Sequence, residues 1–160
     1  MSTTHRVVTR DEWLRERTAF LAKEKEFTRA RDQLNRERRD LPWVAVEQPY
    51  VFDGAKGRQL LVDLFEGRSQ LIVYHFMFAP NASVGCPHCS FWADNFNDVI
   101  VHLNQRDTTM VAVSRAPYET LAAYKARMGW SFTWLSSAST PFNFDYHASF
   151  TPEAVGAKRV

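Results

Sequence analysis

The sequence predicts an α/β domain with a central, mostly parallel sheet, preceded by one long helix. The first observation is a set of three apolar runs, at 71–78, 109–113 and 132–135, which have the length of buried strands. The second is that helical patterns fill both intervals between these runs. Strands and helices that alternate at these lengths form right-handed crossovers and a largely parallel sheet. We expect residues 1–42 to form a helical extension and residues 43–160 to form the sheet domain.

The third observation is a continuous helical pattern from residue 10 to about residue 40. Apolar side chains recur there at every seventh position, at Trp13, Phe20, Phe27 and Leu34. The helix should end at Leu41-Pro42, because a residue that precedes proline is excluded from the helical region. Two interpretations of the stripe remain open. It packs on the sheet of its own domain, or it forms a heptad seam between two subunits.

Residues 43–61 are expected to form a short hairpin. The segments 43–46 and 50–52 resemble strands, and residues 53–57 carry the glycines and the aspartate typical of turns. The run 71–78 follows and is almost continuously apolar, which predicts a central strand that is buried on both faces. His75 interrupts it and is interpreted as a hydrogen-bonded core residue.

The remaining elements follow in order. Between the cysteines and residue 103 we expect a helix with one broad apolar face, to which Phe91 and Trp92 contribute as core residues. Residues 109–113 form the second strand. Pro117 then opens a helix that Gly129 ends, and the third strand is 132–135.

Composition excludes several classes of function. The formal net charge is only +2, and the arginines of residues 29–39 are interleaved with acidic residues, so we expect no nucleic-acid partner. There is no secretory signal and no apolar run as long as a membrane span, so we expect a cytoplasmic protein without a membrane partner. A permanent structural disulfide is not expected in that compartment.

The two cysteines of the chain lie three positions apart, in the motif Cys86-Pro87-His88-Cys89. They follow a predicted strand and begin a helix, the place where open α/β sheets carry their working residues. Pro87 fits the first helical position, which leaves Cys86 at the cap. Free N–H groups and the helix dipole there favour a thiolate at Cys86, and His88 could add positive charge or a hydrogen bond. Cys89 lies one turn deeper and would stay protonated longer.

This pattern predicts a redox dithiol in which Cys86 attacks and Cys89 resolves. Two other interpretations remain open: a zinc site, and two inert packing cysteines. A zinc site needs about four ligands, and the chain offers no second paired motif, so we expect neither a metal nor another cofactor. Arg115 ends the second buried strand and should lie at the same sheet edge as Cys86. There it could lower the pKa of the thiol or hold an acidic group of the substrate. The other interpretation of Arg115 is a surface ion pair or a residue that starts the next helix.

The residues before the motif resemble those of peroxiredoxins. That family has a threonine or serine three residues before its peroxidatic cysteine, and Ser83 occupies this position here. The proline of the family pattern is matched by Pro80, one position closer to the cysteine than in the family. The segment 61–68 before the strand is also peroxiredoxin-like. The resemblance implies a role for Ser83 beside the substrate, and it implies a thiol peroxidase as the alternative activity. In that reaction Cys86 becomes a sulfenic acid, which condenses with Cys89 to form a disulfide.

Nearly the whole chain resembles a bacterial family of thioredoxin-like proteins described as predicted dithiol–disulfide oxidoreductases, once catalogued as a domain of unknown function. The segments that carry this resemblance are 24–32, 41–44, 67–71, 74–78, 86–96, 113–117, 127–130 and 149–153. The resemblance implies a thioredoxin-like fold and a redox dithiol. Family members continue well beyond the position of Glu153, so the closing C-terminal hairpin of the fold is expected to be missing. Pro141 and Pro152 are the late prolines, and neither precedes an obvious strand.

The sequence thus predicts a thiol–disulfide oxidoreductase that acts on a disulfide or thiol of a protein or a small molecule. The reaction also requires an electron donor, which the sequence does not identify. A peroxidase and a non-enzymatic redox-sensing or interaction protein are the alternatives. An unpaired sheet edge recruits other chains, and so does an apolar helix stripe. We therefore expect a homodimer, because two-fold closure is the commonest form of assembly.

Overall fold

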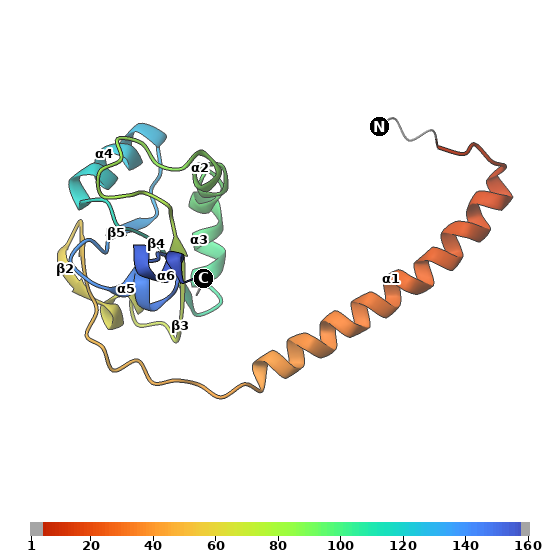
Figure 1. Ribbon diagram of the computed structural model, residues 1–160, viewed down its shortest axis with the longest axis horizontal. Coiled ribbons are helices and arrows are strands. Elements are labelled where there is room, and N and C mark those ends of the chain that lie inside the picture. The colour runs from red at the N-terminus through yellow and green to blue at the C-terminus, as the bar shows by residue number, and fades with distance from the viewer. Residues whose placement is uncertain (1–4, 158–160) are drawn as a thin grey trace. The chain divides into compact units, whose positions relative to one another are not determined.

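The computed structural model describes residues 5–157, and the chain divides into two compact units between Val46 and Glu47. The first unit contains one long helix, α1 (Arg10–Arg39), as the apolar periodicity predicts (Figure 1). The Thr9 side chain caps it by accepting a hydrogen bond from the Glu12 N–H at 3.3 Å. Acidic residues occupy its first turn and arginines its last, so both ends complement the helix dipole.

No side chain of α1 is buried. The apolar stripe is exposed along its whole length, from 53% at Leu34 to 70% at Phe27. Within residues 5–157, no helix is both long and apolar enough to cross a membrane.

The second unit begins with a hairpin of β1 (Val51–Gly54) and β2 (Gly57–Leu60), in which Gly54 is paired with Gly57. The expected strand at 43–46 is wrong: that segment has no regular structure, and Trp43 is 95% exposed. The turn joins β1 and β2, the two segments directly before and after it, so the hairpin does not include residues 43–46. Gly57 supplies the positive φ of 83° that the turn requires. A 3₁₀ helix, η1 (Leu61–Phe65), follows.

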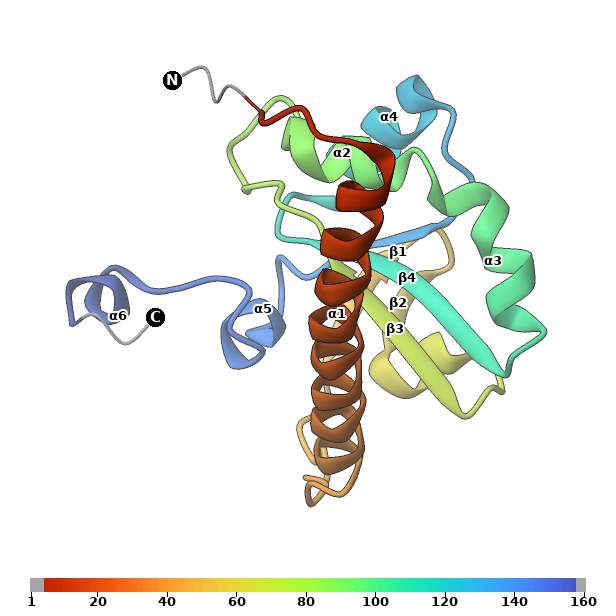
Figure 2. The ribbon, with the colours of Figure 1, turned by 90° about the vertical axis from the view of Figure 1, so that its right-hand side faces the viewer.

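Five strands form one mixed sheet in the order β2-β1-β5-β4-β3. The later strands are β3 (Gln70–His75), β4 (Thr108–Ser114) and β5 (Thr133–Ser136). They are parallel to one another, and β3 runs beside β4 from end to end (Figure 2). The hairpin joins this parallel part through an antiparallel contact of β1 with β5. The predicted α/β class, with a long helix before the sheet, is confirmed.

The prediction that residues 71–78 form a central strand is wrong, because β3 is an edge strand and β4 lies in the interior. The strand also stops at His75, and the apolar run continues as an extended segment to Phe78. That segment remains attached to the sheet: the Phe76 N–H donates to Val113 O at 2.9 Å, and the Ala116 N–H donates to Phe78 O at 3.0 Å. The fully buried residues of the apolar run, Phe76 and Phe78, therefore lie in this segment, and no residue of β3 itself is fully buried.

The sheet separates two hydrophobic layers. Three helices pack on one face: α2 (Pro87–Ala93), α3 (Phe96–Asn104) and α4 (Tyr118–Met128). The connections from β3 to β4 and from β4 to β5 have the same hand and move along the sheet in the same direction. Their helices therefore lie on the same face of the sheet. The layer under them is rich in aromatic rings, among them Phe76, Tyr124 and Trp134. The opposite face is covered by η1 and by Phe142 of α5 (Phe142–Asp145).

The expected single helix after the cysteines is broken at Asp94 and Asn95 into α2 and α3. Its apolar face is also different from the one predicted. The side chains that reach the core are Cys89, Ala93, Phe96 and Ile100, a true helical series. Phe91 and Trp92 are 68% and 61% exposed, so the assignment of Trp92 to the core is wrong. Small residues at the inner positions let α2 approach the sheet closely, and the larger aromatic residues lie outside.

Residues 137–157 contain two short helices, α5 and α6 (Pro152–Gly156), and no strand. Pro141 and Pro152 each precede or open one of these helices, where a missing N–H is tolerated. Within the described residues, β3 is paired on one side only.

Candidate active site

The dithiol motif begins α2, with Cys86 at the N-cap and Pro87 at the first helical position, as the sequence predicts. The Cys86 carbonyl accepts the first helical hydrogen bond from the Ser90 N–H at 3.0 Å, and the Ser90 hydroxyl donates to the same oxygen at 3.1 Å. Both cysteines are free thiols, with Cys86 half-buried and Cys89 buried at 5% exposure. One thiol is therefore accessible, and the other lies one turn behind it.

The extended segment after β3 holds both cysteines through a single residue, Met77. Its carbonyl accepts a hydrogen bond from the Cys86 N–H at 3.1 Å, and its own N–H donates to the Cys89 sulfur at 3.5 Å. The dithiol loop is thus tied to the end of the sheet through the main chain of Met77. The contact with Cys86 joins two main-chain groups, and the contact with Cys89 needs the sulfur of that side chain.

The helix N-terminus makes Cys86 more acidic than an ordinary cysteine, as its position at the cap predicts. The backbone N–H of Cys89 lowers the pKa of the Cys86 thiol, and the backbone N–H of His88 and the Cys89 thiol act in the same direction. Partial burial opposes them by raising the pKa, and the net direction is downward. His88 therefore contributes through its main chain, while its side chain is exposed.

Tyr74 of β3 is a neighbour of the dithiol that the sequence analysis did not identify. Burial raises the pKa of its phenol above the ordinary value, and a hydrogen bond with the Cys89 thiol adds to the effect. The ring packs against Phe96 with a centroid distance of 4.9 Å, which fixes its position. Period-two alternation places Tyr74 on the same face of the strand as Phe76, and this signal could have revealed it.

Gly85, directly before Cys86, lies against the aromatic core. A Cβ atom at this position would be 2.7 Å from Cε1 of Phe76 and 3.4 Å from Cδ1 of Phe78. Both rings are buried, so neither can move aside without cost. Glycine is what allows the loop to approach the core closely and to set the height of Cys86 above it.

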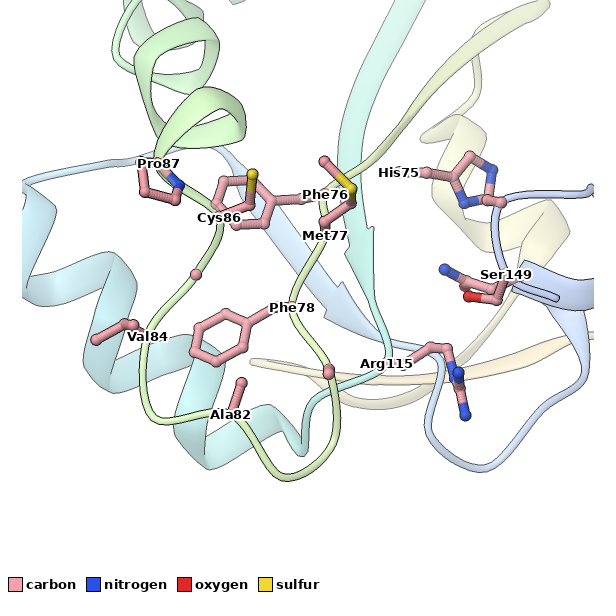
Figure 3. Close-up of a pocket in the computed structure, with 14 residues that line it drawn as sticks. His75, Phe76, Met77, Phe78, Ala82, Val84, Cys86, Pro87, Arg115 and Ser149 are labelled. Carbon is pink, nitrogen blue, oxygen red and sulfur yellow. The ribbon is translucent and has the colours of Figure 1, made fainter. Parts of the chain in front are cut away.

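Beside Cys86 lies a cavity of about 450 Å³, here called the Cys86 cavity (Figure 3). Its walls are mostly apolar and include Phe76, Met77, Phe78 and Pro87. Arg115, which directly follows β4, lies on the opposite side with His75 and Ser149. Asn143 is also a lining residue. The cavity therefore joins an accessible thiol to a polar end.

His75 differs from the expectation of a hydrogen-bonded core residue. Its ring stacks on Phe142 at 5.3 Å, and its buried Nδ1 atom has no hydrogen-bond partner among residues 5–157. Burial lowers the pKa of the imidazole, so His75 is neutral near pH 7. The sequence shows the interruption of the apolar run but not the cavity at its end.

The structure brings together some of the sequence-predicted site residues and separates others. Cys86, Pro87 and Arg115 line the Cys86 cavity, and Cys89 lies behind Cys86 in the core. Ser83 is exposed in the preceding loop and is not one of the lining residues. Arg115 is not one of the main influences on the pKa of Cys86, which come from the helix N–H groups and the neighbouring thiol. Within residues 5–157, no three His, Cys, Asp or Glu side chains are grouped as metal ligands would be.

A family model and a solved structure match this chain. No curated protein sequence matches it. One solved structure that resembles it is a cysteine-to-serine mutant of PrxQ from Xylella fastidiosa, at 18% identity and with a TM-score of 0.46. The match covers 68% of this chain and 61% of the PrxQ chain, so it spans about three fifths of that structure. A family model described as bacterial protein of unknown function (DUF899) matches residues 2–159. Because this match covers nearly every residue, from the helix before the sheet to the segment after α6, the chain belongs to the DUF899 family.

Proposed function

We propose that this protein is a dithiol–disulfide oxidoreductase in which Cys86 is the attacking thiol and Cys89 the resolving thiol. The observation that carries the proposal is the asymmetry of the pair. Cys86 is accessible, caps a helix and has a lowered pKa, whereas Cys89 is buried one turn behind it. A thiolate at the surface with a second thiol beneath it is the arrangement that two-step exchange requires.

The reaction balances with the two thiols alone. The Cys86 thiolate attacks one sulfur of a substrate disulfide, the substrate S–S bond breaks, and one substrate thiolate leaves. The Cys89 thiol loses its proton and attacks the Cys86 sulfur, which releases the second substrate thiolate and forms the Cys86–Cys89 disulfide. Two electrons pass to the substrate, and the departing thiolates take up two protons. An external thiol reductant then restores the dithiol.

The pH dependence of alkylation tests the assignment of the attacking thiol. Because the helix N–H groups lower the pKa of Cys86, its reaction with iodoacetamide should rise with pH to a midpoint below that of an ordinary cysteine. The Cys89→Ser variant isolates Cys86, and the Cys86→Ser variant reports Cys89 alone. A midpoint at or above the ordinary value for Cys86, or faster labelling of Cys89, would contradict the assignment.

Hydrogen peroxide distinguishes exchange from the alternative peroxidase activity. Rapid consumption of peroxide, with a sulfenic acid at Cys86 that dimedone labels, would favour the peroxidase. Slow consumption, together with fast exchange with a disulfide, would favour the proposal above.

We also propose that the protein forms a homodimer through α1. Support comes from the exposed stripe of Trp13, Phe20, Phe27 and Leu34, because sustained seven-residue spacing is the pattern of helices that coil around a partner. Light scattering at low micromolar concentration should give the mass of a dimer for the full chain.

The Phe20→Glu/Phe27→Glu double variant should give the mass of a monomer, because it places charges in the seam. A matched control is Ala22→Glu/Arg29→Glu, which lies two positions further along and therefore about 200° around the helix. A full chain that is monomeric, or a dimer that is insensitive to the first variant, contradicts this mode of assembly.

A further inference from the structure

The Cys86 cavity carries one positive charge that has no counter-charge. None of its 14 lining residues is an aspartate or a glutamate. His75 is neutral because burial lowers its pKa, so Arg115 is the one cationic lining residue. A mostly apolar cavity with a single cation at one end and a reactive thiol at the other is an asymmetric site, and its two ends select different groups of a ligand.

Arg115 is held in position but its donors are unused. Its guanidinium carbon lies 4.4 Å from the centroid of the Phe144 ring, a cation–π contact that leaves the N–H edge of the group free. Within residues 5–157, this cation–π contact is the one polar side-chain contact of the Arg115 guanidinium. A guanidinium has five N–H donors in a planar fork, and a carboxylate is the group that fits this fork through two parallel hydrogen bonds.

Two neutral hydrogen-bond donors accompany Arg115 among the residues that line the cavity. Asn143 is a buried lining residue, and its Oδ1 accepts a hydrogen bond from the Ser137 hydroxyl at 2.6 Å. Its amide nitrogen is therefore the atom that can donate a hydrogen bond to a ligand. Ser149 also lines the cavity, as Figure 3 shows beside Arg115. Together these groups provide hydrogen-bond donors for an anion. No acidic side chain lines the cavity to compete with that anion for Arg115.

We propose that the Cys86 cavity binds a small disulfide that bears a carboxylate, with the carboxylate at Arg115 and one disulfide sulfur at the Cys86 thiolate. This proposal rests on the dithiol exchange proposed above and names its substrate class. The volume of about 450 Å³ is in the range of small-molecule sites. The apolar walls between the two ends take up the carbon chain that links the carboxylate to the sulfur.

The experiment compares two disulfides of similar size in the full-length protein. Dithiodipropionate carries the carboxylate, and hydroxyethyl disulfide carries a neutral hydroxyl in its place. The quantity measured is the ratio of their second-order rate constants for reaction with Cys86. Loss of a charge-assisted contact should lower this ratio by about tenfold or more in Arg115→Met. Arg115→Lys keeps the charge and should give an intermediate ratio.

Arg127→Met is the matched control. Arg127 also stacks on an aromatic ring, that of Tyr124 at 5.1 Å, but it is not one of the residues that line the Cys86 cavity. The ratio of the two rate constants in Arg127→Met should equal that of the wild-type protein. Circular dichroism of each variant verifies the fold before the ratios are compared.

The outcomes separate the two proposals. An unchanged ratio in Arg115→Met, with hydroxyethyl disulfide still reacting at Cys86, overturns the carboxylate assignment and leaves the exchange activity in place. A wild-type protein that reacts with neither disulfide overturns the exchange activity and the substrate class with it. A ratio that falls equally in Arg127→Met assigns the effect to the general charge of the surface and also overturns the proposal.

Discussion

Replacement of Cys86 by serine should reduce disulfide exchange to the uncatalysed rate, because a serine hydroxyl cannot form the thiolate that attacks the disulfide. Replacement of Cys89 should have a different consequence. The Cys89→Ser protein keeps the helix N–H groups that lower the pKa of Cys86, so the first attack still occurs. With no resolving thiol, the mixed disulfide between Cys86 and one half of the substrate should accumulate.

Intact-mass spectrometry after addition of a small disulfide measures both results. Cys89→Ser should gain the mass of one substrate half, and Cys86→Ser should gain none. The wild-type protein should lose the mass of two hydrogen atoms as its internal disulfide forms. Because Cys89 accepts a hydrogen bond from the Met77 N–H, Cys89→Ala is a useful second variant that removes this acceptor as well. Exchange that persists in Cys86→Ser, or a mixed disulfide that forms at Cys89 in preference, would exclude the proposed roles.

The largest expected effect on stability is at Phe76. Its ring is 1% exposed and lies 4.6 Å from Trp134, 5.9 Å from Trp130 and 6.5 Å from Tyr124, centroid to centroid. Removal of a buried phenylalanine side chain costs the transfer free energy of the ring and leaves a cavity. Phe76→Ala should therefore lower the free energy of unfolding by about 3–5 kcal/mol.

Phe91→Ala is the matched control for this measurement. It removes the same side chain from a position that is 68% exposed, so its effect should be within about 0.5 kcal/mol of zero. Urea unfolding followed by near-ultraviolet circular dichroism measures both variants. If Phe76→Ala does not fold, Phe76→Leu provides a milder truncation at the same site. Equal stability of the Phe76 and Phe91 variants would contradict the packing described here.

The sequence by itself determined the parts of this protein that depend on neighbours along the chain. Helix α1 follows from its periodicity, its N-cap and the charges at its ends, all of which act within a few residues. Strands β4 and β5 and the end of α4 at Gly129, with its φ of 70°, follow from local pattern and turn chemistry. The position of Cys86 at a helix cap follows equally, because proline at the next position favours the first helical turn.

Only the tertiary structure decided which segments meet. The apolar run of β3 has the composition of a central strand, yet its place at the edge depends on strand pairing that the run itself does not encode. The outward position of Phe91 and Trp92 is a similar case, because the apolar face of α2 is chosen by how closely Cys89 and Ala93 can approach the sheet. Local hydrophobicity measures the tendency of a side chain to be buried, and the partner surface determines whether it is.

The candidate site shows the same division. The dithiol is a local motif, and the sequence was sufficient to identify it. The Cys86 cavity is not local: it combines the end of β3, the dithiol loop, the residue after β4 and the segment around α5, which are separated by up to about seventy residues. His75 and Arg115 could be singled out in the sequence, but Tyr74, Asn143 and Ser149 acquire their relation to the site only when the sheet and α5 bring these segments together. Chain folding, and not residue type, places a cation and a reactive thiol in one cavity.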